Sequence, residues 1–96
     1  MNVLGKNILN DFLKTHAIAT SSIQAWLSEV ENKKWNNTVD IRERFASASF
    51  LSDNVVIFNI KGNSFRLEVS VAFESKTVMI MWIGTHAEYD KRNKKR

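Results

Sequence analysis

Cysteine and proline are absent from this 96-residue chain, and it has only two histidines, His16 and His86. Without cysteine neither a disulfide nor a thiolate metal site can form, and two histidines so far apart in sequence do not predict a zinc site. No apolar run approaches the roughly 18–20 residues that span a membrane, and the N-terminus lacks a signal-peptide pattern. We therefore expect a cytoplasmic protein with no metal, no cofactor and no membrane partner.

Positive charge outweighs negative charge in the chain as a whole but not in its body. The formal net charge is +4, yet residues 91–96 alone carry five Lys or Arg. Residues 1–90 hold nine basic and ten acidic side chains, a balance of −1. We expect a single domain over 1–90 followed by a basic tail over 91–96. Any anion-binding site must therefore be local. Release of counterions from a handful of phosphates would give moderate affinity at best, so a partner surface could be needed to deliver a substrate.

The first part of the chain has apolar residues at helical spacing. These residues predict two amphipathic helices, over about 7–15 and 22–32. Ser21 and Gln24 have the spacing of a capping box, which predicts where the second helix begins. A short helical turn is also predicted over 38–44, and a short edge strand near Val3 and Leu4.

From Val55 onward the apolar period changes to two. Segments 54–60, 65–73 and 77–83 are rich in Val, Ile and Phe and predict three antiparallel strands. Two-residue turns at Gly62-Asn63 and Ser75-Lys76 would place Arg66 opposite both Asn59 and Thr85. The expected fold is α+β, with two N-terminal helices packed on one face of a small twisted, mainly antiparallel sheet.

Strand alternation predicts that the two faces of this sheet differ. One face is wholly apolar, includes Trp82, and is expected under the helices. The other face gathers polar groups at one corner, just where the last strand ends. They are Asn59, Lys61, Arg66 and Thr85, with His86 and Tyr89 immediately downstream. This corner is the predicted functional site.

Each of the main candidates also has an ordinary structural interpretation. Arg66 could bind a phosphate bidentately, or be an exposed arginine paired with Glu68 or Asp53. His86 could act as a general acid or base near neutral pH, or be a polar residue at a helix start. Tyr89 could stack on a base, or cap the edge of the core.

Other side chains near the corner are equally open to two interpretations. Glu68 and Asp90 are potential bases, but a carboxylate beside Arg66 is expected to be its ion-pair partner. Met79 and Met81 could form an adaptable surface for a partner, or be covered by the C-terminal segment.

Several strings of residues resemble those of a known family. The strongest are Phe58-Asn59-Ile60-Lys61-Gly62-Asn63, followed by Phe65-Arg66-Leu67, and Gly84-Thr85-His86-Ala87-Glu88-Tyr89-Asp90. Shorter matches are Ala25-Trp26, Trp35, Asp40-Ile41-Arg42 and Ala48-Ser49. With these strings the chain resembles the HigB family of bacterial toxins, within the RelE-like group of ribosome-dependent messenger-RNA endonucleases.

The resemblance implies a RelE-like fold and metal-independent cleavage of mRNA on the ribosome, by attack of the RNA 2′-hydroxyl on the adjacent phosphate. By position, Arg66 would hold the scissile phosphate and His86 would transfer a proton. Lys61 would assist electrostatically and Tyr89 would orient the substrate, with Asn59 and Thr85 as further RNA-binding groups. The implied partners are mRNA, ribosomal RNA and a HigA-like helix-turn-helix antitoxin.

The chain departs from this family pattern at two positions of the open face. Relatives often carry basic residues where Ser70 and Met81 stand, and the tail over 91–96 is unusually basic. The alternative is therefore a weakened or inactive member that only binds its antitoxin or ribosomal RNA. A third interpretation is a small α+β interaction domain.

Overall fold

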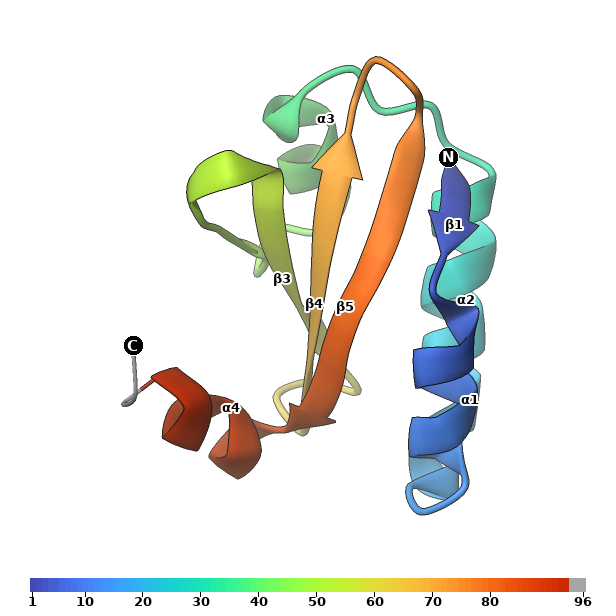
Figure 1. The fold of residues 1–96 in the computed structure, drawn as a ribbon, viewed down its shortest axis with the longest axis vertical. Coiled ribbons are helices and arrows are strands. Elements are labelled where there is room, and N and C mark those ends of the chain that lie inside the picture. The colour runs from blue at the N-terminus through green and yellow to red at the C-terminus, as the bar shows by residue number, and fades with distance from the viewer. Residues whose placement is uncertain (94–96) are drawn as a thin grey trace.

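Five strands form one sheet in a computed structural model that describes residues 1–93 (Figure 1). The sheet order is β1-β5-β4-β3-β2. β1 runs parallel to β5, and the other neighbours are antiparallel. The bounds are β1 (Asn2–Leu4), β2 (Ser49–Phe50), β3 (Val55–Ile60), β4 (Phe65–Ala72) and β5 (Thr77–Thr85). The predicted α+β class and mainly antiparallel sheet are confirmed.

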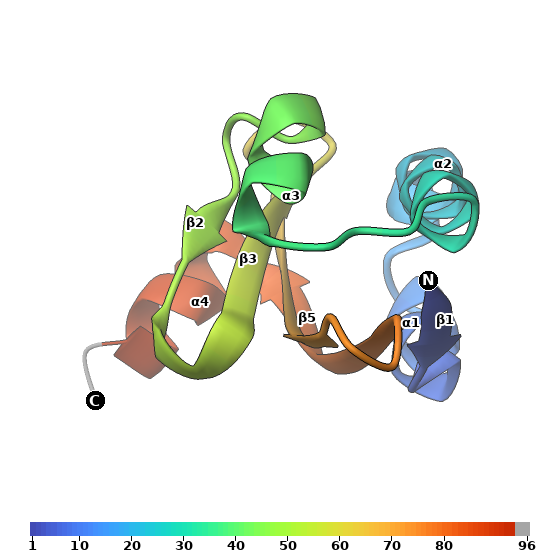
Figure 2. The ribbon, with the colours of Figure 1, turned by 90° about the horizontal axis from the view of Figure 1, so that it is seen from above.

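Four α-helices accompany the sheet within residues 1–93. They are α1 (Lys6–Leu13), α2 (Thr20–Glu31), α3 (Thr38–Arg44) and α4 (His86–Asn93), with single 3₁₀ turns at η1 (Ala17–Ala19) and η2 (Ser52–Asn54). Figure 2 shows α1 and α2 on one side of the sheet and α4 on the other. The prediction of two helices on one face was therefore incomplete, because it lacked α4, which covers part of the other face of the sheet. No helix among these residues is long and apolar enough to cross a membrane.

The start of α2 differs from the predicted capping box. Its N-cap is Ala19, the last residue of η1, and no side chain caps the helix there. The hydroxyl of Thr20 donates back to the Ala17 carbonyl over 2.7 Å. Because the 3₁₀ turn runs directly into α2, the helix begins before Ser21 and the predicted box was wrong.

The core lies between α1, α2, α3 and one face of the sheet. Phe58 is 1% exposed and sits at its centre. The centroid of its ring is 5.0 Å from that of Phe45, 5.4 Å from that of Trp26 and 6.3 Å from that of Trp35. Trp35 is 3% exposed, so it packs the α2–α3 connection onto the core.

The β3–β4 hairpin has the predicted register. Asn59 lies opposite Arg66, and Ile60 lies opposite Phe65. The left-handed φ angles fall at Lys61 (53°) and Gly62 (64°), one position earlier than the predicted pair. Four turn residues, 61–64, separate the strands, and they bring the ends of β3 and β4 to the corner predicted to be functional.

Ser75 and Lys76 lie in the β4–β5 turn as predicted, but the turn is longer than the predicted two residues. Four residues, 73–76, connect β4 to β5, and Ala72 lies opposite Thr77. Lys76 takes a φ of 54°, and its N–H donates to the Phe73 carbonyl over 3.4 Å. The longer turn shifts the pairing by two residues. A shift of two leaves every side chain on its predicted face.

A β-bulge then changes the faces along β5. The pairing is irregular between Glu68 and Val69, and Met81 is the extra residue of β5. Beyond the bulge, Ile83 lies in the core at 8% exposure, and Trp82 lies on the opposite face. The predicted inward position of Trp82 was therefore wrong.

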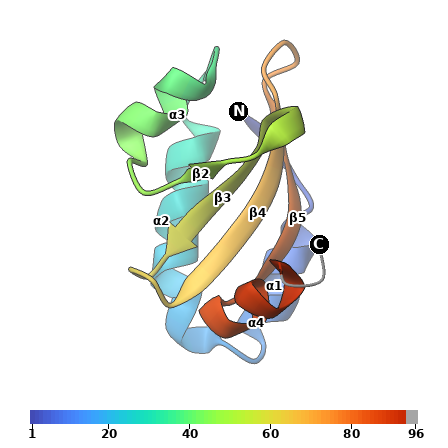
Figure 3. The ribbon, with the colours of Figure 1, turned by 90° about the vertical axis from the view of Figure 1, so that its left-hand side faces the viewer.

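α4 packs on the side chain of Trp82 through Tyr89 and Arg92. In Figure 3, α4 lies in front of β4 and β5. The Arg92 guanidinium lies 4.4 Å from the centroid of the Trp82 ring and 3.2 Å from a Glu68 carboxylate oxygen. Glu68 is 2% exposed and pairs with Arg92. Within residues 1–93 no ion pair joins Glu68 to Arg66, so the predicted Arg66–Glu68 pair was wrong. A Cβ at Gly84 would lie 2.4 Å from the Trp82 ring, which explains the need for glycine there.

The first residues of the predicted C-terminal tail belong to a helix. α4 runs to Asn93, so Lys91 and Arg92 are helical, and residues 94–96 of the predicted basic tail lie outside the described residues. Met79 and Met81 are 42% and 46% exposed. Within residues 1–93, α4 therefore leaves these two methionines uncovered.

Candidate active site

Arg66 is held at the end of the sheet by the backbone of the β3–β4 turn. Its Nη1 donates to the carbonyls of Asn63 and Phe65, over 3.2 and 3.4 Å. In the sheet, Arg66 lies opposite Gly84, and Thr85 lies opposite Phe65. The predicted Arg66–Thr85 pair was therefore off by one residue. The guanidinium nevertheless points to the start of α4.

His86 is the first residue of α4 and meets Arg66 directly. The backbone N–H of His86 donates to the Ser64 carbonyl over 3.1 Å, which ties the helix start to the β3–β4 turn. Nδ1 of its ring lies 3.0 Å from Nη2 of Arg66. Nε2 lies 3.0 Å from a carboxylate oxygen of Asp90, one helical turn later. A guanidinium, an imidazole and a carboxylate thus lie in one row.

The row is open to solvent. The side chains of His86 and Asp90 are 49% and 56% exposed, and Arg66 is half-buried. A polymer can therefore reach the row without a conformational change. A fixed cation can bind a phosphate oxygen, and a free nitrogen of the adjacent imidazole can accept a proton. From the sequence, Asp90 is predicted only as a base or as a partner of Arg66. Its spacing of four from His86 is the signal that indicates the observed contact.

Thr85 caps α4. Its backbone N–H donates to a Glu88 carboxylate oxygen over 2.8 Å, and the Glu88 N–H donates to the Thr85 hydroxyl over 3.1 Å. This reciprocal pair is a capping box, which the Thr-x-x-Glu spacing could have revealed. Thr85 therefore fixes where the helix begins and how His86 is presented. Its predicted contact with RNA would have to share the hydroxyl with this cap.

The capping box should make α4 sensitive to acid. The backbone hydrogen bond from Thr85 lowers the pKa of the Glu88 carboxyl from its ordinary value of 4.5. A lowered folded-state pKa means that the stabilisation is present above the unfolded pKa and is lost as pH falls through the folded value. In an NMR titration we expect the Glu88 carboxyl midpoint below 4.5, with fraying of α4 at lower pH. A midpoint at or above the ordinary value would contradict the cap, and Glu88→Gln should remove this pH dependence.

Tyr89 lies one turn along α4 and is half-buried. Its ring centroid is 6.1 Å from that of Trp82, at an interplanar angle of 44°. Tyr89 therefore helps to seat α4 on the open face of the sheet. Its predicted role on the substrate stays a prediction.

Asn59 and Lys61 face a separate hollow. Asn59 donates from Nδ2 to the Ser47 carbonyl over 3.1 Å, and within residues 1–93 neither side chain hydrogen-bonds to the guanidinium of Arg66. Both line a hollow of about 170 Å³, whose other walls include Trp26 and Arg44. Their predicted contact with the substrate phosphate is therefore not preformed.

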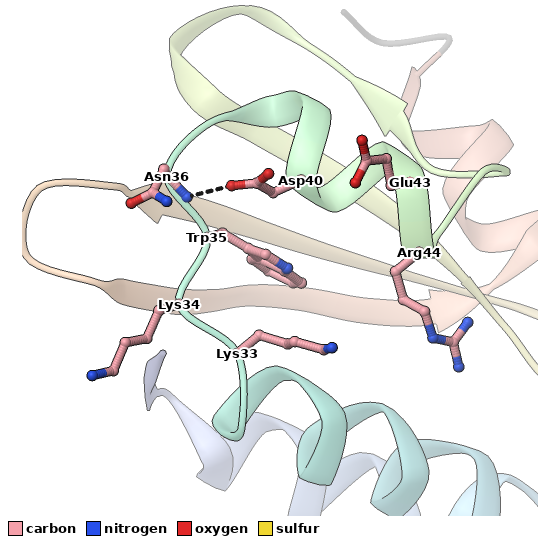
Figure 4. A pocket seen from close by; sticks show the side chains of 7 residues that line it. All are labelled: Lys33, Lys34, Trp35, Asn36, Asp40, Glu43 and Arg44. Atoms are coloured by element: carbon pink, nitrogen blue, oxygen red, sulfur yellow. Dashed lines mark hydrogen bonds between the residues drawn. The ribbon is translucent and has the colours of Figure 1, made fainter.

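A second hollow, of about 420 Å³, lies between the end of α2 and α3 (Figure 4). Its lining combines basic and acidic side chains, and the Asn36 N–H donates to Asp40 over 2.8 Å. The lining residues are Lys33, Lys34, Trp35, Asn36, Asp40, Glu43 and Arg44. None of the six predicted site residues lines it. The described part of the chain also holds no group of three His, Asp or Glu placed to bind a metal ion.

A sequence model of the HigB toxin, the RelE-like toxic component of a toxin–antitoxin system, matches residues 19–92. The chain belongs to the HigB toxin family. The match runs from the end of η1 into α4, and it includes Arg66, His86 and Asp90. A HigB toxin acts opposite an antitoxin, so an antitoxin is a partner of this chain. A search of curated proteins found no match.

Proposed function

We propose that this HigB-family chain is an endoribonuclease toxin that cleaves mRNA on the ribosome, without a metal ion. The observation that carries the proposal is the Arg66–His86 contact of 3.0 Å at the exposed end of β4 and β5. A phosphate-binding cation beside a proton acceptor is the minimum that RNA transesterification needs. Since the substrate is presented by ribosomes, the protein acts in the cytoplasm.

The chemistry uses only the RNA and these side chains. Arg66 donates to the non-bridging oxygens of the scissile phosphate and stabilises the charge that develops on them. His86 takes the proton of the neighbouring 2′-hydroxyl, the O2′–P bond forms, and the P–O5′ bond breaks. The leaving O5′ takes a proton from water, and His86 returns its proton to solvent. The products are a 2′,3′-cyclic phosphate and a 5′-hydroxyl.

The charge of the protein supports delivery of RNA by a larger partner. Residues 1–90 carry a balance of −1, so the domain surface offers little general attraction to a polyanion. Lys61 and Tyr89 would then contact RNA that the ribosome has already placed at the row. For the antitoxin we propose a HigA-like protein with a helix-turn-helix domain.

Expression in cells tests the function. Wild-type protein should arrest growth and produce new mRNA 5′ ends that carry a hydroxyl, whereas His86→Ala should do neither. The other histidine supplies the matched control. His16 stacks on Phe12 with ring centroids 4.1 Å apart, and His16→Gln should remain toxic.

A binding-only member of the family is the second candidate. Ser70 and Met81 stand where relatives often carry basic side chains, and Ser70 lies opposite Met79 on the open face. Growth arrest by His86→Ala equal to that of wild type, with no new mRNA ends, would contradict cleavage and support this candidate.

A further inference from the structure

The two nitrogens of the His86 ring face partners of opposite character. Nδ1 lies 3.0 Å from Nη2 of Arg66, and Nε2 lies 3.0 Å from Oδ2 of Asp90. A guanidinium has only donors, so Nδ1 must accept. An ionised carboxylate has only acceptors, so Nε2 must donate. Together the contacts select a neutral ring whose single proton is on Nε2.

We propose that Asp90 is a positioning residue that holds this tautomer of His86. Nδ1 is then the atom that takes the proton of the RNA 2′-hydroxyl. In the free protein Arg66 covers Nδ1, until the RNA phosphate draws the guanidinium away. The inference rests on the proposed function, and it names the atom at which the proton transfer occurs.

Helix geometry gives Asp90 this position. It follows His86 by four residues on α4, and side chains at this spacing lie on the same face of a helix. Because both side chains are about half exposed, the pair contributes little to folding stability. Its effect is orientation of the ring. Without the carboxylate the ring can turn over or move its proton, and an N–H then faces the 2′-hydroxyl in place of a lone pair.

Arg66 makes a second group of contacts that can persist in both the free and the RNA-bound protein. Nη1 is held by the carbonyls of Asn63 and Phe65, while Nη2 faces His86. These contacts use at most three of the five donors of a guanidinium, which leaves capacity for a phosphate oxygen. The side chain can therefore stay anchored to the turn while Nη2 changes partner.

Substrate binding would then uncover the base. Phosphate oxygens are charged acceptors and compete well with a neutral ring nitrogen for a guanidinium N–H. The 2′-hydroxyl belongs to the nucleotide that carries this phosphate, so a phosphate that draws Nη2 away brings the hydroxyl toward the vacated Nδ1. The proton passes from O2′ to Nδ1 as the O2′–P bond forms and the P–O5′ bond breaks.

Cleavage kinetics on purified ribosomes that carry mRNA provide the first test. In Asp90→Asn the amide can either accept from or donate to Nε2, so the tautomer is no longer fixed. We expect kcat to fall about 10- to 100-fold, part of what a positioned base contributes, with KM changed less than about twofold. Asp90→Glu keeps a carboxylate and should recover much of kcat. The control is Asp11→Asn, an exposed helical carboxylate 3.4 Å from Lys14, which should match wild type.

NMR of the ¹⁵N-labelled imidazoles provides a second readout that does not depend on activity. In the free wild-type protein at a pH where His86 is neutral, its proton should be on Nε2. In Asp90→Asn the two tautomers should mix, while in Arg66→Ala the Nε2 proton should remain. A wild-type ring protonated on Nδ1, or an Asp90→Asn variant with wild-type kcat, would overturn the inference.

The two proposals fail differently. If wild-type protein leaves ribosome-bound mRNA intact, the proposed function is contradicted, and the NMR result still decides the role of Asp90 in fixing the ring. If wild-type protein cleaves and Asp90→Asn cleaves equally well, only the inference is overturned.

Discussion

Arg66→Ala is expected to lower the rate of mRNA cleavage about 10³-fold, the scale at which loss of a group that stabilises phosphoryl charge is felt. Arg66 is the cation of the row, and its Nη2 lies 3.0 Å from the proposed base. The protein should fold normally, because the side chain is half-buried at the end of the sheet. Single-turnover cleavage of mRNA in ribosome complexes measures the effect, and thermal melting checks the fold.

Two variants separate the geometry of Arg66 from its charge. Arg66→Lys keeps a positive charge but loses the planar fork, so it should recover only a small part of the rate. Arg42→Ala is the matched control: Arg42 is exposed on α3, 4.8 Å from the centroid of the Phe50 ring, and its loss should leave the rate unchanged. Equal cleavage rates for Arg66→Ala and Arg42→Ala would contradict a role of Arg66 in the reaction.

Phe58→Ala is expected to lower the free energy of unfolding by about 3–5 kcal/mol. The ring is 1% exposed and packs against aromatic rings from α2, from the α2–α3 connection and from the segment after α3. Its removal leaves a cavity that these bulky neighbours cannot close. Because the total stability of a small domain is about 5–15 kcal/mol, a large part of it would be lost. Urea unfolding followed by tryptophan fluorescence gives the difference.

Phe73 supplies the control for this prediction. It lies in the four-residue turn between β4 and β5 and is only partly buried against the core. Phe73→Ala should therefore cost much less than Phe58→Ala. Equal losses would mean that Phe58 is not at the centre of the core.

The sequence contained enough information for one hairpin and not for the other. Gly62 and the flanking alternation determine the β3–β4 pairing, because one residue of slip would expose a whole apolar face. The β4–β5 pairing depends on a four-residue turn and on the bulge at Met81, and neither has a distinct sequence signal. The longer turn moves the pairing by two residues and the bulge returns it by one. The alternation rule then failed at Trp82, which lies on the open face.

The sequence predicted that Arg66 and His86 lie close together, although it did not predict their exact pairing. Arg66 and His86 come at the ends of adjacent strands, so an error of one residue in pairing still leaves them close together. The ion pair between Glu68 and Arg92 was not predictable, because Arg92 is 24 positions away and reaches Glu68 only after α4 packs on Trp82. The hollow beside Asn59 and Lys61 likewise depends on where α3 packs, which no local pattern reports.

The attachment of α4 also orders events during synthesis of the protein. Arg66 is synthesised before His86 and Asp90, and Arg92, which anchors α4 to Glu68 and Trp82, follows them. A nascent chain that has completed only β5 contains Arg66, the proposed phosphate-binding cation, but lacks His86, the proposed proton acceptor. The proposed site is therefore incomplete until α4 has been synthesised and has packed on Trp82.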